Sequence, residues 1–180
     1  MKYFYFSLIC FLSFTAYSQD DKKNIIGIGY YNNSLKSSEV FLNRSDFQTA
    51  FIEYDWIHQK SYGFGLEIHK SLGSDPNYYS IALKLGFVLN NHQRIQFPIA
   101  PYVGFWNLDD RGDTYGSALL GIKSGVRVYI TNNLSIQGVY HLARLTVNKI
   151  NDQRLDNGSF GSFMSIGPAV SLQYYFARET

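Results

Sequence analysis

The residues best suited to chemistry in this sequence are charged side chains set among glycine, alanine and serine. They fall at alternate positions of segments whose other positions carry large apolar residues, so they are expected to share one side of each segment. The set holds three acids, three bases and one histidine: Glu53, Asp55, Glu67, Lys84, Lys123, Arg127 and His141. A buried charge that loses its partner costs roughly 3–5 kcal/mol. The equal numbers of acids and bases therefore predict a network whose charges neutralise one another, with a narrow polar path or an active site as alternatives.

A second acidic group lies further along the chain, where Asp109, Asp110 and Asp113 are close in sequence. Carboxylate oxygens are the ligands that Ca²⁺ prefers, but the spacing matches no defined calcium loop. We therefore expect a solvated acidic loop, and we attach no adhesive role to the Arg111-Gly112-Asp113 tripeptide. The sequence predicts no metal site, no cofactor and no catalytic residue.

Eight segments of alternating character must position these side chains. They span residues 24–31, 46–57, 61–72, 78–89, 94–106, 116–131, 134–147 and 162–176. The connections alternate between short turns and long loops, the clearest long loops being 32–45, 107–115 and 148–161. Asn132-Asn133 is expected to form a two-residue hairpin turn, because asparagine tolerates positive φ. An even number of such segments with this loop rhythm predicts an all-β fold, an eight-stranded antiparallel up-and-down transmembrane β-barrel.

The two faces of each segment decide which side meets lipid. A soluble barrel, the rival architecture, would put its large apolar residues inside and long charged side chains outside. Here the polar face is mostly small, which suits a crowded interior, so the apolar face is expected to look outward. Aromatic residues near the segment ends are typical of membrane-interface girdles. The expected outer girdle is Tyr30, Tyr79 and Phe105, and the expected inner girdle is Trp56, Tyr174 and Phe176.

Inside such a barrel the charges fall into pairs. Glu67 and Lys84 lie on neighbouring strands at similar depth. The strands that carry Glu53 and Lys123 lie on opposite walls, so Glu53 and Asp55 are expected to face Lys123 and Arg127 across a narrow lumen. The network is thus predicted to hold the barrel closed.

The first residues predict a secretory signal peptide over residues 1–18, followed by one barrel domain over 19–180. Lys2 precedes a short apolar run, and small residues stand at Ala16 and Ser18, before the expected cleavage point. Cys10 is the single cysteine and falls within this leader, so thiol chemistry is not expected of the mature chain. The net charge of +2 is too balanced to suggest a nucleic-acid partner.

With this pattern the chain resembles the small outer-membrane β-barrels of the OmpA, OmpX and OmpW type. The most specific match is the last strand, where apolar residues alternate at Val170, Leu172, Tyr174 and Phe176. These residues look like the insertion signal that the barrel assembly machinery reads. The resemblance implies a place in the outer membrane of a Gram-negative bacterium, with membrane lipid as the surrounding partner.

Three functions remain open from the sequence. The first is a structural or interaction barrel with a closed lumen, whose loops 32–45 and 148–161 contact an external ligand. The second, implied by OmpW-like relatives, is a narrow transporter or channel for small or apolar solutes. The third is a lipid-modifying enzyme, but barrel lipid A deacylases carry a His-x-Ser-Asn motif where this chain has His141-Leu142-Ala143-Arg144. Because Ala143 offers no hydroxyl, we do not expect an enzyme.

Three prolines conflict with a regular closed barrel. Pro98, Pro101 and Pro168 fall inside expected strands, and each removes a backbone donor from the hydrogen-bond ladder. We expect them in β-bulges or near the barrel rims.

Overall fold

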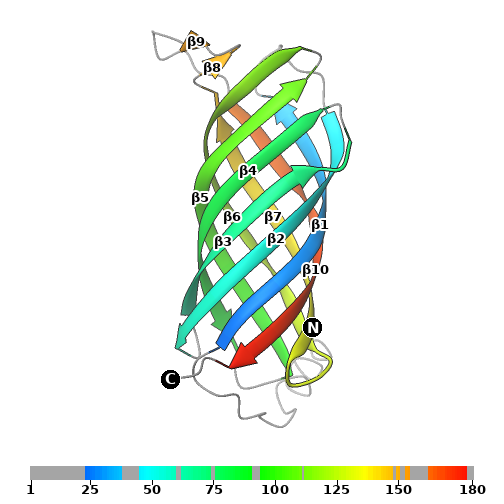
Figure 1. Cartoon of the computed structure of the whole chain (residues 1–180), viewed down its shortest axis with the longest axis vertical. Helices are drawn as coiled ribbons and strands as arrows, with labels where there is room; N and C mark the ends of the chain where they lie inside the picture. Colours follow the sequence, from blue (N-terminus) through cyan, green and yellow to red (C-terminus); the bar gives the residue numbers. More distant parts are fainter. Residues whose placement is uncertain are drawn as a thin grey trace, which may run out of the picture.

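The chain forms a closed β-barrel in the computed structural model (Figure 1), which describes residues 23–37, 45–59, 62–73, 76–90, 94–110, 112–147, 149–150, 153–154 and 162–177. Eight long strands build the wall, in the order β5-β4-β3-β2-β1-β10-β7-β6, and pairing of β5 with β6 closes it. Their bounds are β1 Lys23–Ser37, β2 Ser45–Gln59, β3 Tyr62–Ser71, β4 Asn77–Leu89, β5 Ile95–Asp110, β6 Asp113–Tyr129, β7 Leu134–Thr146 and β10 Ser162–Ala177. The described residues include no helix that is long and apolar enough to cross a membrane.

All of these pairings are antiparallel, which confirms the predicted fold class. A small hairpin of β8 (Lys149–Ile150) and β9 (Gln153–Arg154) pairs with β6 beyond the wall. The predicted signal peptide, residues 1–18, lies outside the described residues. The start of β1 and the end of β10 lie together at the lower end of the barrel in Figure 1, opposite the β8–β9 hairpin.

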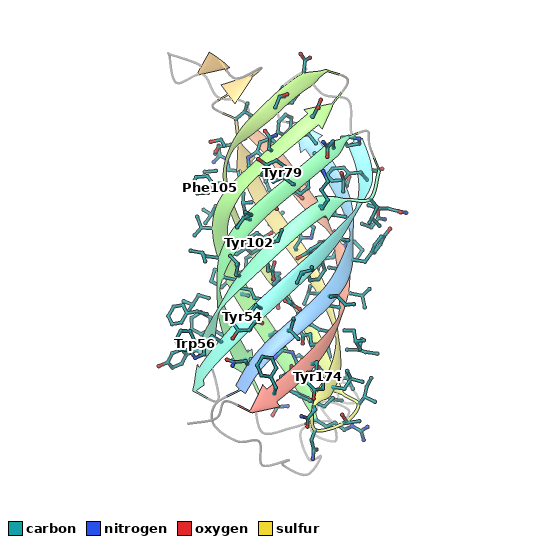
Figure 2. All side chains as sticks on the ribbon, in the orientation of Figure 1. Tyr54, Trp56, Tyr79, Tyr102, Phe105 and Tyr174 are labelled. Atoms are coloured by element: carbon teal, nitrogen blue, oxygen red, sulfur yellow. The ribbon has the colours of Figure 1, made fainter. Side chains whose placement is uncertain are left out.

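Side chains along each strand alternate between the lumen and the outside, as the sequence predicts. On β2, Ile52 is 57% exposed, whereas Glu53 beside it is fully buried. Outward apolar side chains surround the barrel, and Figure 2 shows Tyr79 and Phe105 towards its upper half and Trp56 and Tyr174 near its lower end. These four members of the two expected aromatic girdles therefore lie towards opposite ends of the barrel.

Several strands are longer than predicted, and one predicted loop is wrong. Residues 32–37 continue β1, and residues 107–110 and 113–115 extend β5 and β6. The expected acidic loop over 107–115 is thus a tight hairpin, in which Asp110 opposes Asp113 and Gly112 has a φ of 92°. That positive φ suits glycine, because residues with a side chain rarely adopt it. These extensions are not evident from the sequence, because their polar residues point outward and their apolar residues point into the lumen.

The predicted Asn132-Asn133 turn is also wrong. Strand β6 ends at Tyr129 and β7 begins at Leu134, so four residues connect them. The backbone N–H groups of Ile130 and Thr131 both donate to the carbonyl of Leu134. Among the described non-glycine residues, positive φ occurs at Asn90 instead (60°).

The three prolines lie at gaps in the ladder rather than at bulges. Pairing of β4 with β5 stops after Lys84–Tyr102 and resumes at Phe87–Ile99, which leaves Pro101 unpaired there. The β5–β6 ladder omits Pro98, and the β1–β10 ladder omits Pro168. The register resumes unshifted each time, so the prolines remove hydrogen bonds without inserting a residue.

Candidate functional site: an ion cluster in the lumen

The centre of the lumen is built on an unfavourable pair. Glu53 on β2 and Glu67 on β3 stand directly opposite each other in the β2–β3 register, and both are fully buried. Like charges directly opposite on neighbouring strands destabilise a sheet. The two carboxylates therefore need cations supplied from other strands.

Lys84 on β4 supplies the first cation. Its Nζ lies 2.5 Å from Glu53 Oε2, 2.7 Å from Asp55 Oδ1 and 2.9 Å from Glu67 Oε1. One ammonium thus joins three carboxylates from two strands, and Lys84 itself is 5% exposed. The predicted Glu67–Lys84 pair is present, with two further acids on the same cation.

Lys123 on β6 reaches the same acids from the opposite wall. Its Nζ forms an ion pair with Glu67 and lies 3.5 Å from Glu53 Oε2. The cation also lies 5.8 Å from the centre of the Phe51 ring. The predicted contact across the lumen is therefore present for Lys123.

Neutral side chains that no sequence pattern singles out complete the cluster. Gln173 and Ser171 on β10 donate to Glu53 Oε1, at 2.7 Å and 3.1 Å. His69 Nε2 lies 3.1 Å from Glu67 Oε2. All three sit on the inward side that strand alternation assigned to them, but alternation alone does not say which inward residues touch. We call Glu53, Asp55, Glu67, Lys84 and Lys123 the ion cluster.

Arg127 does not join the ion cluster directly, contrary to the prediction. Its Nε donates to Gln137 Oε1 at 2.9 Å, and its guanidinium lies 5.9 Å from the Tyr175 ring centre. Among the described residues, no carboxylate lies within ion-pair distance of it. Gln137 in turn accepts from Gln173 at 3.3 Å. Two glutamines therefore separate Arg127 from Glu53.

His141 also lies apart from the ion cluster, higher in the lumen. Its Nε2 is 3.0 Å from Ser165 Oγ on β10, and Tyr31 packs edge-on against its ring at 4.6 Å between centres. The Ser165 hydroxyl donates to Asn33 Oδ1 at 3.2 Å. The structure thus provides a serine beside His141 that the local run did not reveal, because β10 is far away in sequence.

Above the ion cluster, large apolar side chains fill the lumen. The sequence predicts small residues and ions throughout the lumen, which is wrong for this part of the barrel. The buried apolar cluster holds Leu35, Phe47, Tyr78, Ala82, Tyr102, Trp106, Leu108, Leu119, Ala143, Leu145, Val147 and Phe163. Below the ion cluster, Ile25, Tyr129 and Tyr175 pack together. Side chains therefore occupy the lumen both above and below the charges.

Metal binding finds no support in the described part of the chain, where no group of three or more acidic, histidine or cysteine side chains is placed to hold an ion. Asp109 and Asp113 stand near the joined ends of β5 and β6, not in an open loop. The ion cluster holds its own cations.

Comparison with known proteins identifies the fold. The sequence matches no protein-family model and no curated protein. Neisserial surface protein A is 14% identical with a TM-score of 0.64, and the alignment covers 86% of this chain and 97% of that one. The N-terminal barrel domain of Pseudomonas aeruginosa OprF is 10% identical (TM-score 0.55; 86% and 99% covered). Ail of Yersinia pestis is 14% identical (TM-score 0.51; 87% and 99% covered).

At these identities the likeness concerns the fold. The chain has the fold of the small eight-stranded outer-membrane β-barrels, as the pattern of its sequence indicated. The ion cluster, by contrast, is a property of its own side chains.

Proposed function

We propose that this protein is an outer-membrane barrel with a structural or interaction role and a lumen closed to solutes. The observation that carries the proposal is the ion cluster, in which two lysines on β4 and β6 pair with three carboxylates on β2 and β3. The outward band of apolar side chains supports a lipid surrounding, with both girdles at its edges. The signal peptide expected over residues 1–18 would direct the chain through the inner membrane of a Gram-negative bacterium.

A passing ion would have to separate charges that are buried and paired. Removing one partner from such a pair costs roughly 3–5 kcal/mol. A hydrated ion would also have to cross the apolar cluster above, where Leu108 and Leu145 are almost completely buried. Both obstacles favour a closed barrel over the transporter alternative.

We propose that the protein is not an enzyme, although Ser165 and His141 are within hydrogen-bonding distance. Activation of a serine needs a base that a third group orients. His141 Nδ1 is buried and has no hydrogen-bond partner in the described structure. The adjoining cavity has a volume of about 10 Å³, close to that of one water probe, which leaves no room for a lipid substrate.

The last strand supports a proposed contact with the barrel assembly machinery. Val170, Leu172 and Tyr174 on β10 point outward and are 44–50% exposed, so the alternating signal is presented on the outer surface. Strand β10 pairs along its length with β1, the first strand of the wall. Replacing Tyr174 and Phe176 by serine should slow insertion into membranes that contain the machinery.

External contacts would lie at the end of the barrel opposite the chain termini. The two loops expected to contact a ligand, 32–45 and 148–161, are shorter than predicted. Strands include residues 32–37, 45, 149–150 and 153–154. A structure of Ail holds the heparin analogue sucrose octasulfate. By that analogy, we propose the connections at this end as the place to look for an external ligand.

Two measurements test the proposal. Heat-modifiable migration of outer-membrane fractions on unboiled gels should reveal a folded barrel in that membrane. Purified protein in planar bilayers should show no stepwise conductance. Reproducible single-channel steps from the wild-type protein would favour the transporter, and absence from outer-membrane fractions would reject the location.

A further inference from the structure

A cavity next to the lumen lies just below the ion cluster, on the side formed by β3, β4 and β5. It has a volume of about 40 Å³, enough for a few water molecules or the head of a small ligand. Three cations, Lys84, Lys123 and Arg127, line its inner side together with one acid, Asp55, which pairs with Lys84. The ion cluster closes the lumen above it, and the packed Ile25, Tyr129 and Tyr175 close the lumen below.

The same cavity is lined by residues from the outer surface. Tyr62, Phe87 and Ile99 contribute to it, although strand alternation turns their side chains outward. Phe87 is 41% exposed on the apolar outside of the barrel. Because both lumen-facing and outward-facing residues line this cavity, little material separates the lumen from the outer surface at this place.

The hydrogen-bond ladder is interrupted at this place. Pairing between β4 and β5 is missing between Lys84–Tyr102 and Phe87–Ile99, beside Gly86. Pairing between β5 and β6 is missing between Gln96–Arg127 and Ile99–Ser124. Pro98 and Pro101 cannot donate to these ladders. Strand β5 is therefore less tightly held here on both edges.

Glycines leave the inner side of the wall open. Gly63 and Gly86 face each other in the β3–β4 register. A Cβ added at Gly86 would meet one atom within ordinary contact distance, the Gly63 carbonyl oxygen at 3.8 Å. No side chain at these two positions blocks the way between the outer surface and the cations.

We propose that this window binds a single-chain anionic amphiphile of the fatty-acid type, with its carboxylate inside and its tail on the apolar outer surface. Arg127 is the cation best placed for the head, because Gln137 is the acceptor of its hydrogen bond and no described carboxylate pairs with it. A carboxylate accepts paired N–H groups from a guanidinium well. The small cavity admits a carboxylate and excludes a bulky phospholipid head, so the tail stays outside beside Phe87.

Decanoate is a suitable probe, with decanol and decyltrimethylammonium as neutral and cationic probes of equal chain length. We expect calorimetric titration in uncharged micelles to show decanoate binding at least about tenfold more tightly than either of the others, since a hydrogen-bonded charge accounts for such a factor. Decanoate carrying a photoreactive tail group should cross-link near Tyr62, Phe87 and Ile99. Equal affinity for all three probes, or cross-links spread around the barrel, would overturn the proposal.

Two glycine variants separate the window from the general surface. Gly86→Leu fills the opening, and should abolish the preference for decanoate. Gly138→Leu introduces the same side chain on β7, where an added Cβ meets no atom within 4 Å, and should leave the preference unchanged. Equal behaviour of the two variants contradicts the proposal.

Arg127→Gln should lower decanoate affinity about tenfold and leave decanol binding unchanged. If that variant does not fold, the comparison of Gly86→Leu with Gly138→Leu and the positions of the cross-links still test whether decanoate binds at the window. Decanoate binding at the window and the conductance of the barrel are tested separately, because the ion cluster closes the lumen above the window.

Discussion

The middle and the upper part of the lumen are packed in opposite ways. In the middle, five charged side chains of the ion cluster meet between opposite walls. In the upper part, a ring of aromatic and aliphatic side chains fills the same space, with Trp106 packed edge-on against Phe163 at 5.8 Å between ring centres. Both regions are buried, and β2, β4 and β6 supply side chains to both.

The outer surface changes in the opposite sense. At the level of the ion cluster the outward residues are apolar, such as Ile52 and Leu83, which is 64% exposed. At the level of the apolar cluster exposed Gln48, Asp109 and Arg144 stand among outward apolar residues such as Phe105 and Leu120. The outer surface is thus apolar at the level of the ion cluster and mixed above it, where apolar side chains fill the lumen.

Removal of Lys84 should have the largest effect on this arrangement. Lys84→Ala leaves Lys123 as the remaining cation of the ion cluster beside Glu53, Asp55 and Glu67. We therefore expect the free energy of unfolding in detergent to fall by roughly 3–5 kcal/mol. Tryptophan fluorescence during urea titration measures this. Lys70→Ala, an exposed lysine on β3, is the control and should change stability by about 0–1 kcal/mol.

The same Lys84→Ala variant should remain closed in planar bilayers, because the apolar cluster still fills the lumen above. A large rise in single-channel conductance would show that the charges alone close the barrel.

Trp106→Phe probes the apolar cluster and should have the next largest effect. The indole Nε1 donates to the carbonyls of Ala118 and Thr146, at 3.2 Å and 3.0 Å. Phenylalanine keeps most of the apolar volume but leaves these acceptors without that donor, which should cost about 1–3 kcal/mol. The loss should not depend on salt, and a strong salt dependence would argue that the two regions are not distinct.

A double-mutant cycle can measure the ion pair across the lumen. Glu67→Gln and Lys123→Met, alone and together, should give a coupling energy of roughly 0.5–3 kcal/mol. The cycle Glu67→Gln with Trp106→Phe is its control and should show coupling of about 0.3–0.5 kcal/mol or less, since the two residues share no partner. Similar coupling in both cycles would mean that the lumen behaves as one packed unit.

Ser165→Ala should have the smallest effect. It removes the hydrogen bonds to His141 and Asn33 between the two regions, and we expect a loss of about 0.5–1.5 kcal/mol. Chemical denaturation measures it, with Ser162→Ala at the strand end as a comparison. A loss as large as that of Lys84→Ala would place His141 and Ser165 within the central network after all.

The amino-acid sequence by itself determined the strands and their two faces. Alternation fixes which side chains share a side, because successive residues of a strand point in opposite directions. It therefore predicted Glu53, Glu67, Lys84 and Lys123 inside and Ile52 and Phe105 outside. Strand ends were less predictable, since residues 107–115 carry polar side chains on the outside of a hairpin that lies beyond the apolar band.

Closure of the barrel decided which inward residues meet. Glu53 and Lys123 are 70 residues apart, and Glu53 and Gln173 are 120 apart. Their contacts depend on the tilt and stagger of all eight strands, which no local pattern encodes. The same geometry kept Arg127 away from the carboxylates and brought Ser165 to His141. Local alternation thus sets the direction of each side chain, and the tertiary structure sets its partners, because partners lie on strands that only closure brings together.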